Sequence, residues 1–169
     1  FVLFAGYDFN EGLRFMSELE LEHSLAGDGQ PGEIELEQAY VELDVSDSQS
    51  VRAGLFLVPV GHLNLNHEPP RFYGVERNPV EKYILPTTWW EAGIGAVGAL
   101  GGGWRYAAAI HSGLNTSTGS TYAVRSGRQK VAKADAHDGA GTLALGWMGA
   151  GVSIGGAIQY QANVTQGSD

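Results

Sequence analysis

The chain has 169 residues, a length typical of one domain, with 19 acidic and 10 basic side chains and a formal net charge of −9. This acidic balance offers no basic stripe to phosphates and argues against nucleic acid as a partner. The absence of cysteine excludes a disulfide framework, thiol catalysis and a zinc–thiolate site.

Alternation of apolar and polar residues dominates the chain and predicts β-strands, while no run approaches the roughly eighteen apolar residues of a membrane-spanning helix. The expected strands span residues 1–9, 13–24, 33–45, 51–60, 87–99, 104–113, 140–148 and 152–164. Most match the roughly 9–11 residues with which a tilted strand crosses a bilayer, and exceed the usual soluble strand of about 5–6.

The second expected strand, "LRFMSELELEHS", alternates most regularly, with Leu19 and Leu21 on one face and Glu18, Glu20 and Glu22 on the other. In the third strand the phase of the alternation switches near Glu37–Gln38. An extra residue on one strand shifts the phase in this way, so we expect a β-bulge there.

Short and long connections alternate strictly. The short ones are residues 10–12, 46–50, 100–103 and 149–151, and the long ones are 25–32, 61–86 and 114–139. Outer-membrane barrels have short periplasmic turns and longer external loops. Aromatic residues near strand ends are expected to form the two interfacial girdles: Phe1, Phe9, Trp89, Trp90, Trp104, Tyr106, Trp147 and Tyr160.

The predicted fold is therefore all-β: an antiparallel transmembrane β-barrel, built as an up-and-down meander of about eight strands. We expect residues 1–169 to be part of a larger barrel domain with both ends truncated, because the sequence starts inside a strand pattern. A soluble β-sandwich binding module with an acidic face is the alternative. A barrel enzyme is a second rival, for which the sequence supplies no evident nucleophile and base.

The face opposite the leucines is expected to line a water-filled lumen. Its charged residues are the candidate pore-lining set: Arg14, Glu18, Glu20, Glu22, Glu35, Glu37, Glu42, Arg52, Glu91 and Arg105. Seven of the ten basic residues instead lie in the two longest loops: Arg71, Arg77, Lys82, Arg125, Arg128, Lys130 and Lys133.

The loop 61–86 is rich in proline and apolar residues, which predicts a rigid, packed segment. We expect it to fold into the lumen as a constriction, with Glu68, Arg71, Tyr73, Glu76, Arg77, Glu81 and Lys82 as its candidate functional residues. An ordinary surface loop with exposed ion pairs is the other reading. His62 and His67 with Glu68 match no strong metal-site template, so neither a metal site nor a cofactor is expected.

The segment 66–91, "NHEPPRFYGVERNPVEKYILPTTWWE", resembles the phosphate-selective porin O/P family of Gram-negative outer membranes. The stretches "GEIELEQAYVEL", "RAGLFLVPVG", "HSGLN" and "RSGRQKVA" are similar to that family too. The resemblance implies a non-enzymatic porin in the bacterial outer membrane with about twice as many strands. It also implies a homotrimer surrounded by lipid and lipopolysaccharide, which passes small solutes or ions by diffusion.

Anion selectivity requires a positively charged constriction, whereas the expected wall here is acidic. If the basic loops fold into the lumen, they oppose the wall and create a transverse field. If they stay outside, this part of the pore should favour cations. The sequence leaves the choice between anions, including phosphate, and cations open.

Overall fold

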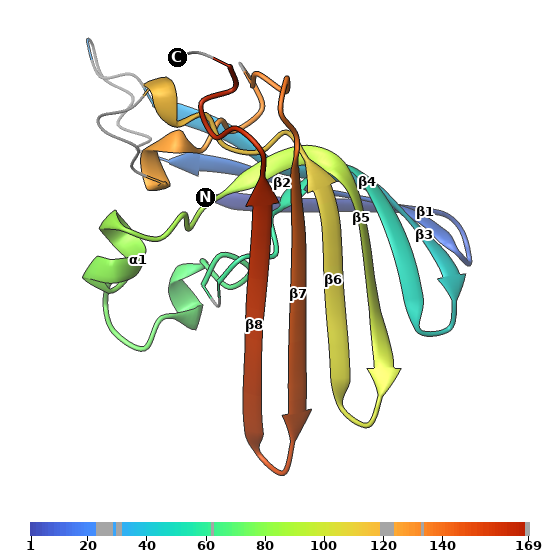
Figure 1. The fold of residues 1–169 in the computed structure, drawn as a ribbon. Helices are drawn as coiled ribbons and strands as arrows, with labels where there is room; N and C mark the ends of the chain where they lie inside the picture. Colours follow the sequence, from blue (N-terminus) through green and yellow to red (C-terminus); the bar gives the residue numbers. More distant parts are fainter. Residues whose placement is uncertain (23–28, 30–31, 62, 119–123, 133, 168–169) are drawn as a thin grey trace.

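A computed structural model describes the chain apart from residues 23–28, 30–31, 62, 119–123, 133 and 168–169, with the backbone alone at Glu22 and Pro69. Eight antiparallel strands form one sheet in chain order (Figure 1). They are β1 (Val2–Asn10), β2 (Leu13–Glu22), β3 (Glu33–Ser46), β4 (Gln49–Leu57), β5 (Trp90–Gly101), β6 (Trp104–His111), β7 (Ala140–Gly149) and β8 (Val152–Gln161). All eight expected strands are confirmed, as an up-and-down meander in one sheet where a sandwich would need two.

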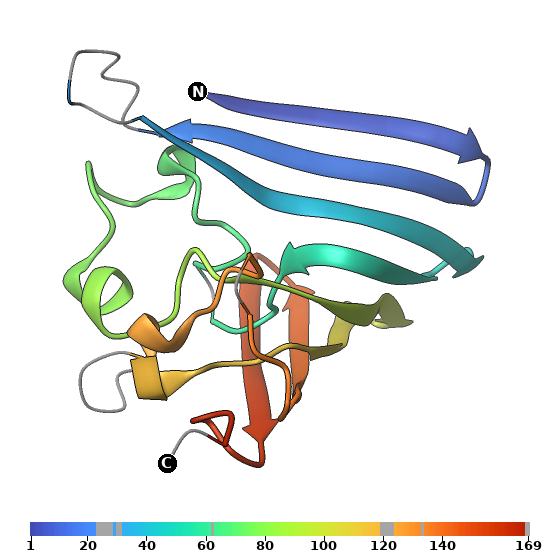
Figure 2. The same cartoon turned by 90° about the horizontal axis from the view of Figure 1, so that it is seen from above.

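The sheet is strongly curved, and its four short hairpin turns lie at the ends opposite the long loops (Figures 1 and 2). The loops carry only short helices: η1 (Pro69–Arg71), α1 (Pro79–Tyr83), η2 (Thr116–Thr118) and η3 (Arg125–Gly127). We call residues 61–86 the first long loop and residues 114–139 the second long loop. Both views place α1, which belongs to the first, and the helices η2 and η3 of the second together on one side of the sheet. No helix among the described residues is long and apolar enough to cross a membrane.

The expected bulge in β3 is confirmed. Glu18 of β2 lies opposite Gln38, whereas the next residue, Leu19, lies opposite Leu36, so Glu37 is the extra residue on β3. Because a bulge shifts the alternation by one position, Glu37 and Gln38 both fall on the acidic side of the sheet. The charged face therefore continues along β3 past the bulge.

The two faces of the sheet differ in chemistry. We call the face that the long loops cover the inner face and the opposite one the outer face. Along the outer face, apolar residues lie opposite one another from strand to strand, for example Ala108, Leu143 and Ile158. Ile110 and Ile158 are 72% and 74% exposed. A continuous exposed apolar face of this extent is typical of a surface that meets another apolar phase.

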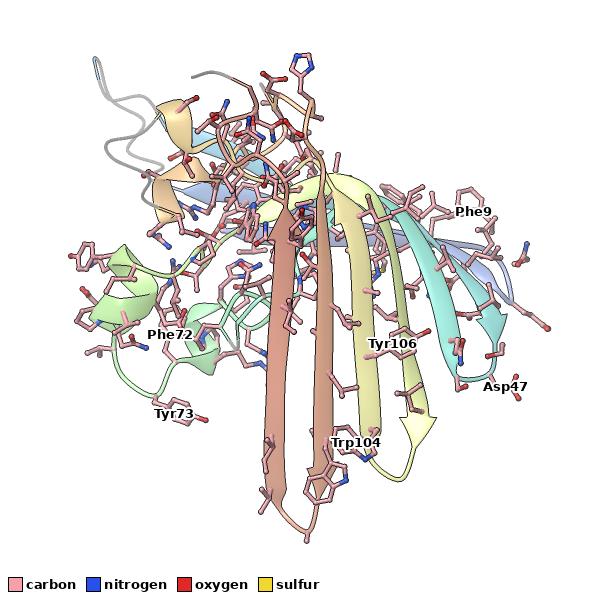
Figure 3. All side chains as sticks on the ribbon, in the orientation of Figure 1. Phe9, Asp47, Phe72, Tyr73, Trp104 and Tyr106 are labelled. Carbon is pink, nitrogen blue, oxygen red and sulfur yellow. The ribbon has the colours of Figure 1, made fainter. Side chains whose placement is uncertain are left out.

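Aromatic residues occupy both ends of the strands, but not in every expected place. Phe9 and Trp104 lie beside hairpin turns and are exposed (Figure 3). Trp89 and Trp90 were expected in a girdle, and this is wrong, because they are 0% and 2% exposed. Trp89 packs with Val58 and Leu114 in a small core beneath the loops. The alternation predicted a strand from residue 87, but β5 begins only at Trp90, because residues 87–89 continue the first long loop.

At Gly54 of β4 the backbone of the neighbouring strand β3 lies too close to leave room for a side chain. Gly54 has a φ of 134°, and a Cβ added there would lie 2.4 Å from the carbonyl oxygen of Ala39. Backbone atoms cannot move aside cheaply, so we expect Gly54→Ala to lower the free energy of unfolding by about 1–3 kcal/mol. Urea unfolding of the refolded full-length protein measures the change.

Gly141→Ala is the matched control, since a Cβ at Gly141 of β7 would meet no atom within 4 Å. The control should unfold close to the wild-type midpoint. Equal stability of the two variants would contradict the close approach of β3 and β4 at Gly54.

Candidate functional site

A charged pocket of about 280 Å³ lies between the inner face and the two long loops. Its acidic lining comes from Glu20, Glu35, Glu37 and Glu68, and its basic lining from His67, Arg77, Arg125, Arg128 and Lys130. The acidic residues are mostly on the strands, while the basic residues all belong to the loops. The structure thus brings opposite charges from distant parts of the chain to one cavity.

The first long loop is closed at its base by Asn64, which is fully buried. The Asn64 side-chain amide donates to the carbonyls of Val58 and Trp89, at 2.7 and 2.8 Å, and its oxygen accepts from the Trp89 N–H at 2.8 Å. Both ends of the loop are therefore held by one side chain. We call this arrangement the Asn64 clasp.

The second long loop is anchored on Glu91, at the start of β5. Its carboxylate accepts hydrogen bonds from Trp89 Nε1 (2.8 Å), Ser112 Oγ (2.5 Å) and the Gln129 N–H (3.1 Å). Glu91 is 0% exposed, so it holds the loop from beneath. Buried carboxylates are tolerated only with such hydrogen-bond partners.

Lys130 connects the same loop to the acidic strand β3. Its Nζ lies 2.5 Å from Glu35 Oε1 and 4.4 Å from the centroid of the Trp90 ring. The two bonded residues are 95 positions apart in the sequence. This ion pair fastens the loop against the inner face.

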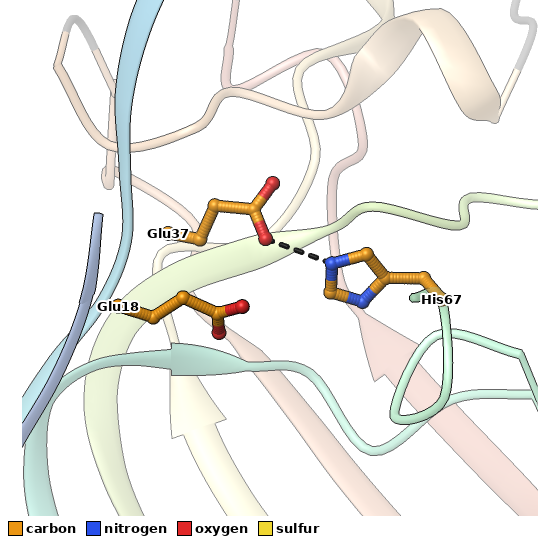
Figure 4. Close-up of side chains that lie close together, drawn as sticks. All are labelled: Glu18, Glu37 and His67. Atoms are coloured by element: carbon orange, nitrogen blue, oxygen red, sulfur yellow. Dashed lines mark hydrogen bonds and ion pairs between the residues drawn. The ribbon is translucent and has the colours of Figure 1, made fainter. Parts of the chain in front are cut away.

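His67 connects the first loop to the inner face at a buried cluster with Glu18 and Glu37 (Figure 4). Its Nδ1 lies 2.9 Å from the Asn64 carbonyl oxygen, and its Nε2 lies 2.8 Å from Glu37 Oε2. Burial acts to lower the pKa of His67, but the hydrogen bond to Glu37 and its charge outweigh burial and raise the pKa to about 9. His67 is therefore an imidazolium at neutral pH that donates both N–H groups.

Arg125 and Arg128 line the pocket and donate hydrogen bonds to backbone carbonyls rather than to carboxylates. Arg125 Nη1 donates to the carbonyls of Glu81, Leu85 and Thr87, each at 3.1 Å. Arg128 Nη1 donates to the carbonyls of Thr87 and Thr88. Among the residues that the structure describes, no carboxylate forms an ion pair or a side-chain hydrogen bond with either guanidinium.

Burial and, to a smaller extent, crowding lower the pKa of two loop arginines. Burial, followed by the charges of Arg125 and Arg77, lowers the pKa of Arg128 to about 10. Burial and the charge of Arg77 also lower the pKa of Arg125. Arginine keeps its charge in proteins, and a nearby anion would stabilise both guanidinium groups. Arg77 adds a guanidinium whose buried Nε has no partner among the described residues.

A second network neutralises the inner face nearer the hairpin turns. Arg14 donates from Nε to Glu42 at 3.1 Å and from Nη1 to Asp44 at 3.0 Å. Arg52 lies 3.1 Å from Glu42 and stacks its guanidinium over Tyr40. Here the acidic residues are paired within the strands themselves, and Arg105 lies further along, exposed on the same face.

The structure divides the candidate residues of the first loop. Glu68 and Arg77 line the pocket. Tyr73 is 99% exposed and points away from the sheet (Figure 3), and the Glu76–Lys82 ion pair, at 3.2 Å, is also exposed. Arg71 is exposed as well, and the backbone carbonyl of Glu81 accepts a hydrogen bond from Arg125.

The remaining candidates on the inner face fall into two groups. Glu18 and Glu91 are buried beneath the loops, whereas Glu20, Glu35 and the buried Glu37 line the pocket. The side chain of Glu22 and the whole of His62 and Lys133 lie outside the described residues. Sequence reasoning missed Asn64, Thr87 and Thr88 as parts of the site, since none carries a charge or a recognisable motif.

The fold and the pocket together define a class of protein: an antiparallel meander with an apolar outer face and a charged inner face onto which long loops fold. The family described as phosphate-selective porin O and P matches residues 2–169, essentially the whole chain. The chain belongs to this family, as the motif in residues 66–91 suggested.

A relative from Aquifex aeolicus (strain VF5), described as an uncharacterized protein, is 45% identical over 98 residues. The matched segment covers 57% of this chain and 22% of that protein. The chain thus matches well under two thirds of the length of this relative.

The Asn64 clasp predicts how the loop responds to mutation. Asn64→Leu keeps roughly the size of the side chain but removes three hydrogen bonds. The Trp89 N–H loses its acceptor, while the Val58 and Trp89 carbonyls keep only the bonds that they accept from the Val60 and Val58 N–H groups. We expect a loss of about 2–5 kcal/mol of local stability, since an unsatisfied buried N–H costs about 1–3 kcal/mol and each lost hydrogen bond about 0.5–1.5 kcal/mol. Hydrogen exchange of residues 58–89 should then become faster.

Asn78→Leu is the control in the same loop. Asn78 caps α1 by accepting from the Glu81 N–H at 3.1 Å, but at an exposed position. Asn78→Leu should lower the stability of α1 by about 1 kcal/mol and make hydrogen exchange faster near α1 only. Unchanged exchange in Asn64→Leu would contradict the clasp.

Proposed function

We propose that this chain forms part of the wall and constriction of a water-filled channel in the bacterial outer membrane. The channel allows passive diffusion of small hydrophilic solutes or ions and carries out no catalysis. Membership of the porin family supports this function, as does the contrast between the two faces of the sheet. The full-length protein has lipid and lipopolysaccharide as neighbours, and we propose that it assembles as a homotrimer.

The observation that carries the proposal is the folding of the basic loops against the acidic inner face. Lys130 binds Glu35, and His67 binds Glu37, so part of the acidic wall is neutralised. Arg125 and Arg128 are held by backbone carbonyls, which leaves their charge to act on solutes. In a narrow passage such opposed charges create a transverse field that orients and selects ions.

We propose that anions, including phosphate, are favoured at this constriction. Guanidinium groups match phosphate oxygens in charge and geometry. The alternative is a cation-preferring porin, in which the remaining carboxylates of the wall outweigh the loops. The experiment is the reversal potential of single-channel currents from the full-length protein in a planar bilayer across a KCl gradient, with phosphate added as a test of inhibition.

Two pocket substitutions should shift the reversal potential in opposite directions. Arg77→Gln removes a positive charge and should lower anion preference, while Glu35→Gln removes a negative charge and should raise it. A unit charge about 6 Å from an ion in water changes its energy by roughly 0.7 kcal/mol. Because the change has opposite signs for an anion and a cation, the anion-to-cation permeability ratio should change by about 1.4 kcal/mol, or roughly tenfold, in each case.

Glu76→Gln is the control for charge alone, because Glu76 pairs with Lys82 at the exposed part of the loop. It should leave the ratio near the wild-type value. A wild-type potential that is cation-selective and insensitive to phosphate would overturn the anion preference. Protein that forms no channels and stays soluble without detergent would overturn the porin function.

If lipid covers the outer face, a charged side chain should destabilise the protein there more than on the inner face. Ile158 and Ala157 are adjacent in β8 and therefore point to opposite faces. Ile158 pairs with Leu143 on the outer face, and Ala157 pairs with Ala144 on the inner face. Ile158→Lys should destabilise the folded state in lipid by about 2–4 kcal/mol if it lies at the bilayer midplane. Urea titration of folding into phosphatidylcholine vesicles measures this cost.

Ala157→Lys places the same charge on the inner face and should cost much less. Equal costs for the two lysines would show that lipid does not cover the outer face. A larger cost for Ala157→Lys would reverse the assignment of the faces.

A further inference from the structure

The geometry points to a site for a divalent transition-metal ion at Glu18, Glu37 and His67, and we propose that this ion holds the first long loop on strands β2 and β3. The site goes beyond the proposed channel function, which does not require it. The probe that we choose is Zn²⁺.

The three side chains converge from separate elements. Glu18 comes from β2, Glu37 from the bulge in β3, and His67 from the first long loop (Figure 4). One potential ligand atom of each lies within 4.8 Å of the others. The exposed fractions are 2%, 1% and 6%. The site is therefore enclosed, and a modest movement of the side chains would bring the ligand atoms to coordination distance.

Two buried carboxylates share one basic side chain in this cluster. Glu37 is paired with His67, and a third carboxylate, that of Glu68, lies 3.7 Å from His67 Nε2. Buried charges in proteins are either paired or coordinate a metal ion. A divalent cation placed between Glu18, Glu37 and His67 would therefore offset the cost of burying both carboxylates.

The surroundings of the ligands are those of a supported metal site. Metal-binding histidines usually donate the N–H of their free ring nitrogen to a carbonyl or carboxylate. Here Nδ1 lies 2.9 Å from the Asn64 carbonyl, which leaves Nε2 directed at the carboxylates. The Gln38 amide donates to Glu18 Oε2 at 2.5 Å and fixes that carboxylate. Binding of the ion would release the Nε2 proton to solvent.

The ligand atoms of the three side chains indicate which class of metal would bind. One imidazole nitrogen with carboxylate oxygens suits Zn²⁺ and neighbouring divalent transition ions. Ca²⁺ and Mg²⁺ prefer sites composed of oxygen alone, and usually more oxygens or retained waters. We therefore expect Zn²⁺ to bind in the presence of excess Mg²⁺.

The test is equilibrium dialysis of the full-length protein in detergent micelles with Zn²⁺, with metal content measured by mass spectrometry. We expect one Zn²⁺ per chain, and at least tenfold weaker binding in Glu18→Gln, Glu37→Gln and His67→Gln. Glu33→Gln is the control, because Glu33 is an exposed glutamate at the start of the same strand as Glu37. It should bind Zn²⁺ as the wild type does.

Two outcomes would overturn the site. One is the absence of stoichiometric Zn²⁺ in wild-type protein, which would leave the His67–Glu37 ion pair to hold the loop without a metal. The other is binding that none of the three substitutions weakens, which would place the ion elsewhere. Far-UV circular dichroism and single-channel currents of each variant show whether it is folded, so that misfolding is not read as loss of a ligand. Normal currents without Zn²⁺ binding would reject this site alone.

Discussion

The structure depends on the need to neutralise carboxylates that the strand alternation places on one face. Nearer the hairpin turns, Arg14 and Arg52 do this within the sheet. Toward the loops the strands supply acidic residues without matching bases, and the loops must bring Lys130 and His67 to them. The position of the loops is thus a consequence of charge balance as much as of apolar packing.

Periodicity and turn chemistry were sufficient to predict the sheet. All eight strands, the four short turns and the bulge at Glu37 are local features, because each is written in neighbouring residues. The errors at Trp89 and Trp90 arose where alternation continues into a segment that tertiary packing turns inward. A pattern of alternation cannot show which other segment will cover it.

The site was less predictable than the sheet. The acidic face and the basic character of the loops could be read from the sequence, but not which charges meet. The pair Lys130–Glu35 joins residues 95 positions apart, and no local signal specifies such a contact. Asn64 was missed for a related reason: its importance comes from the two backbone segments that it bridges, and an isolated asparagine in a loop carries no mark of that role.

The Asn64 clasp also has an evolutionary consequence. Because it fixes both ends of the first long loop, the exposed tip around Tyr73 and Val75 can vary in length or sequence without moving the residues beneath it. Lengthening a loop whose ends are already joined adds little entropic cost. Selection can thus change the exposed tip while the sheet and the pocket beneath it stay the same.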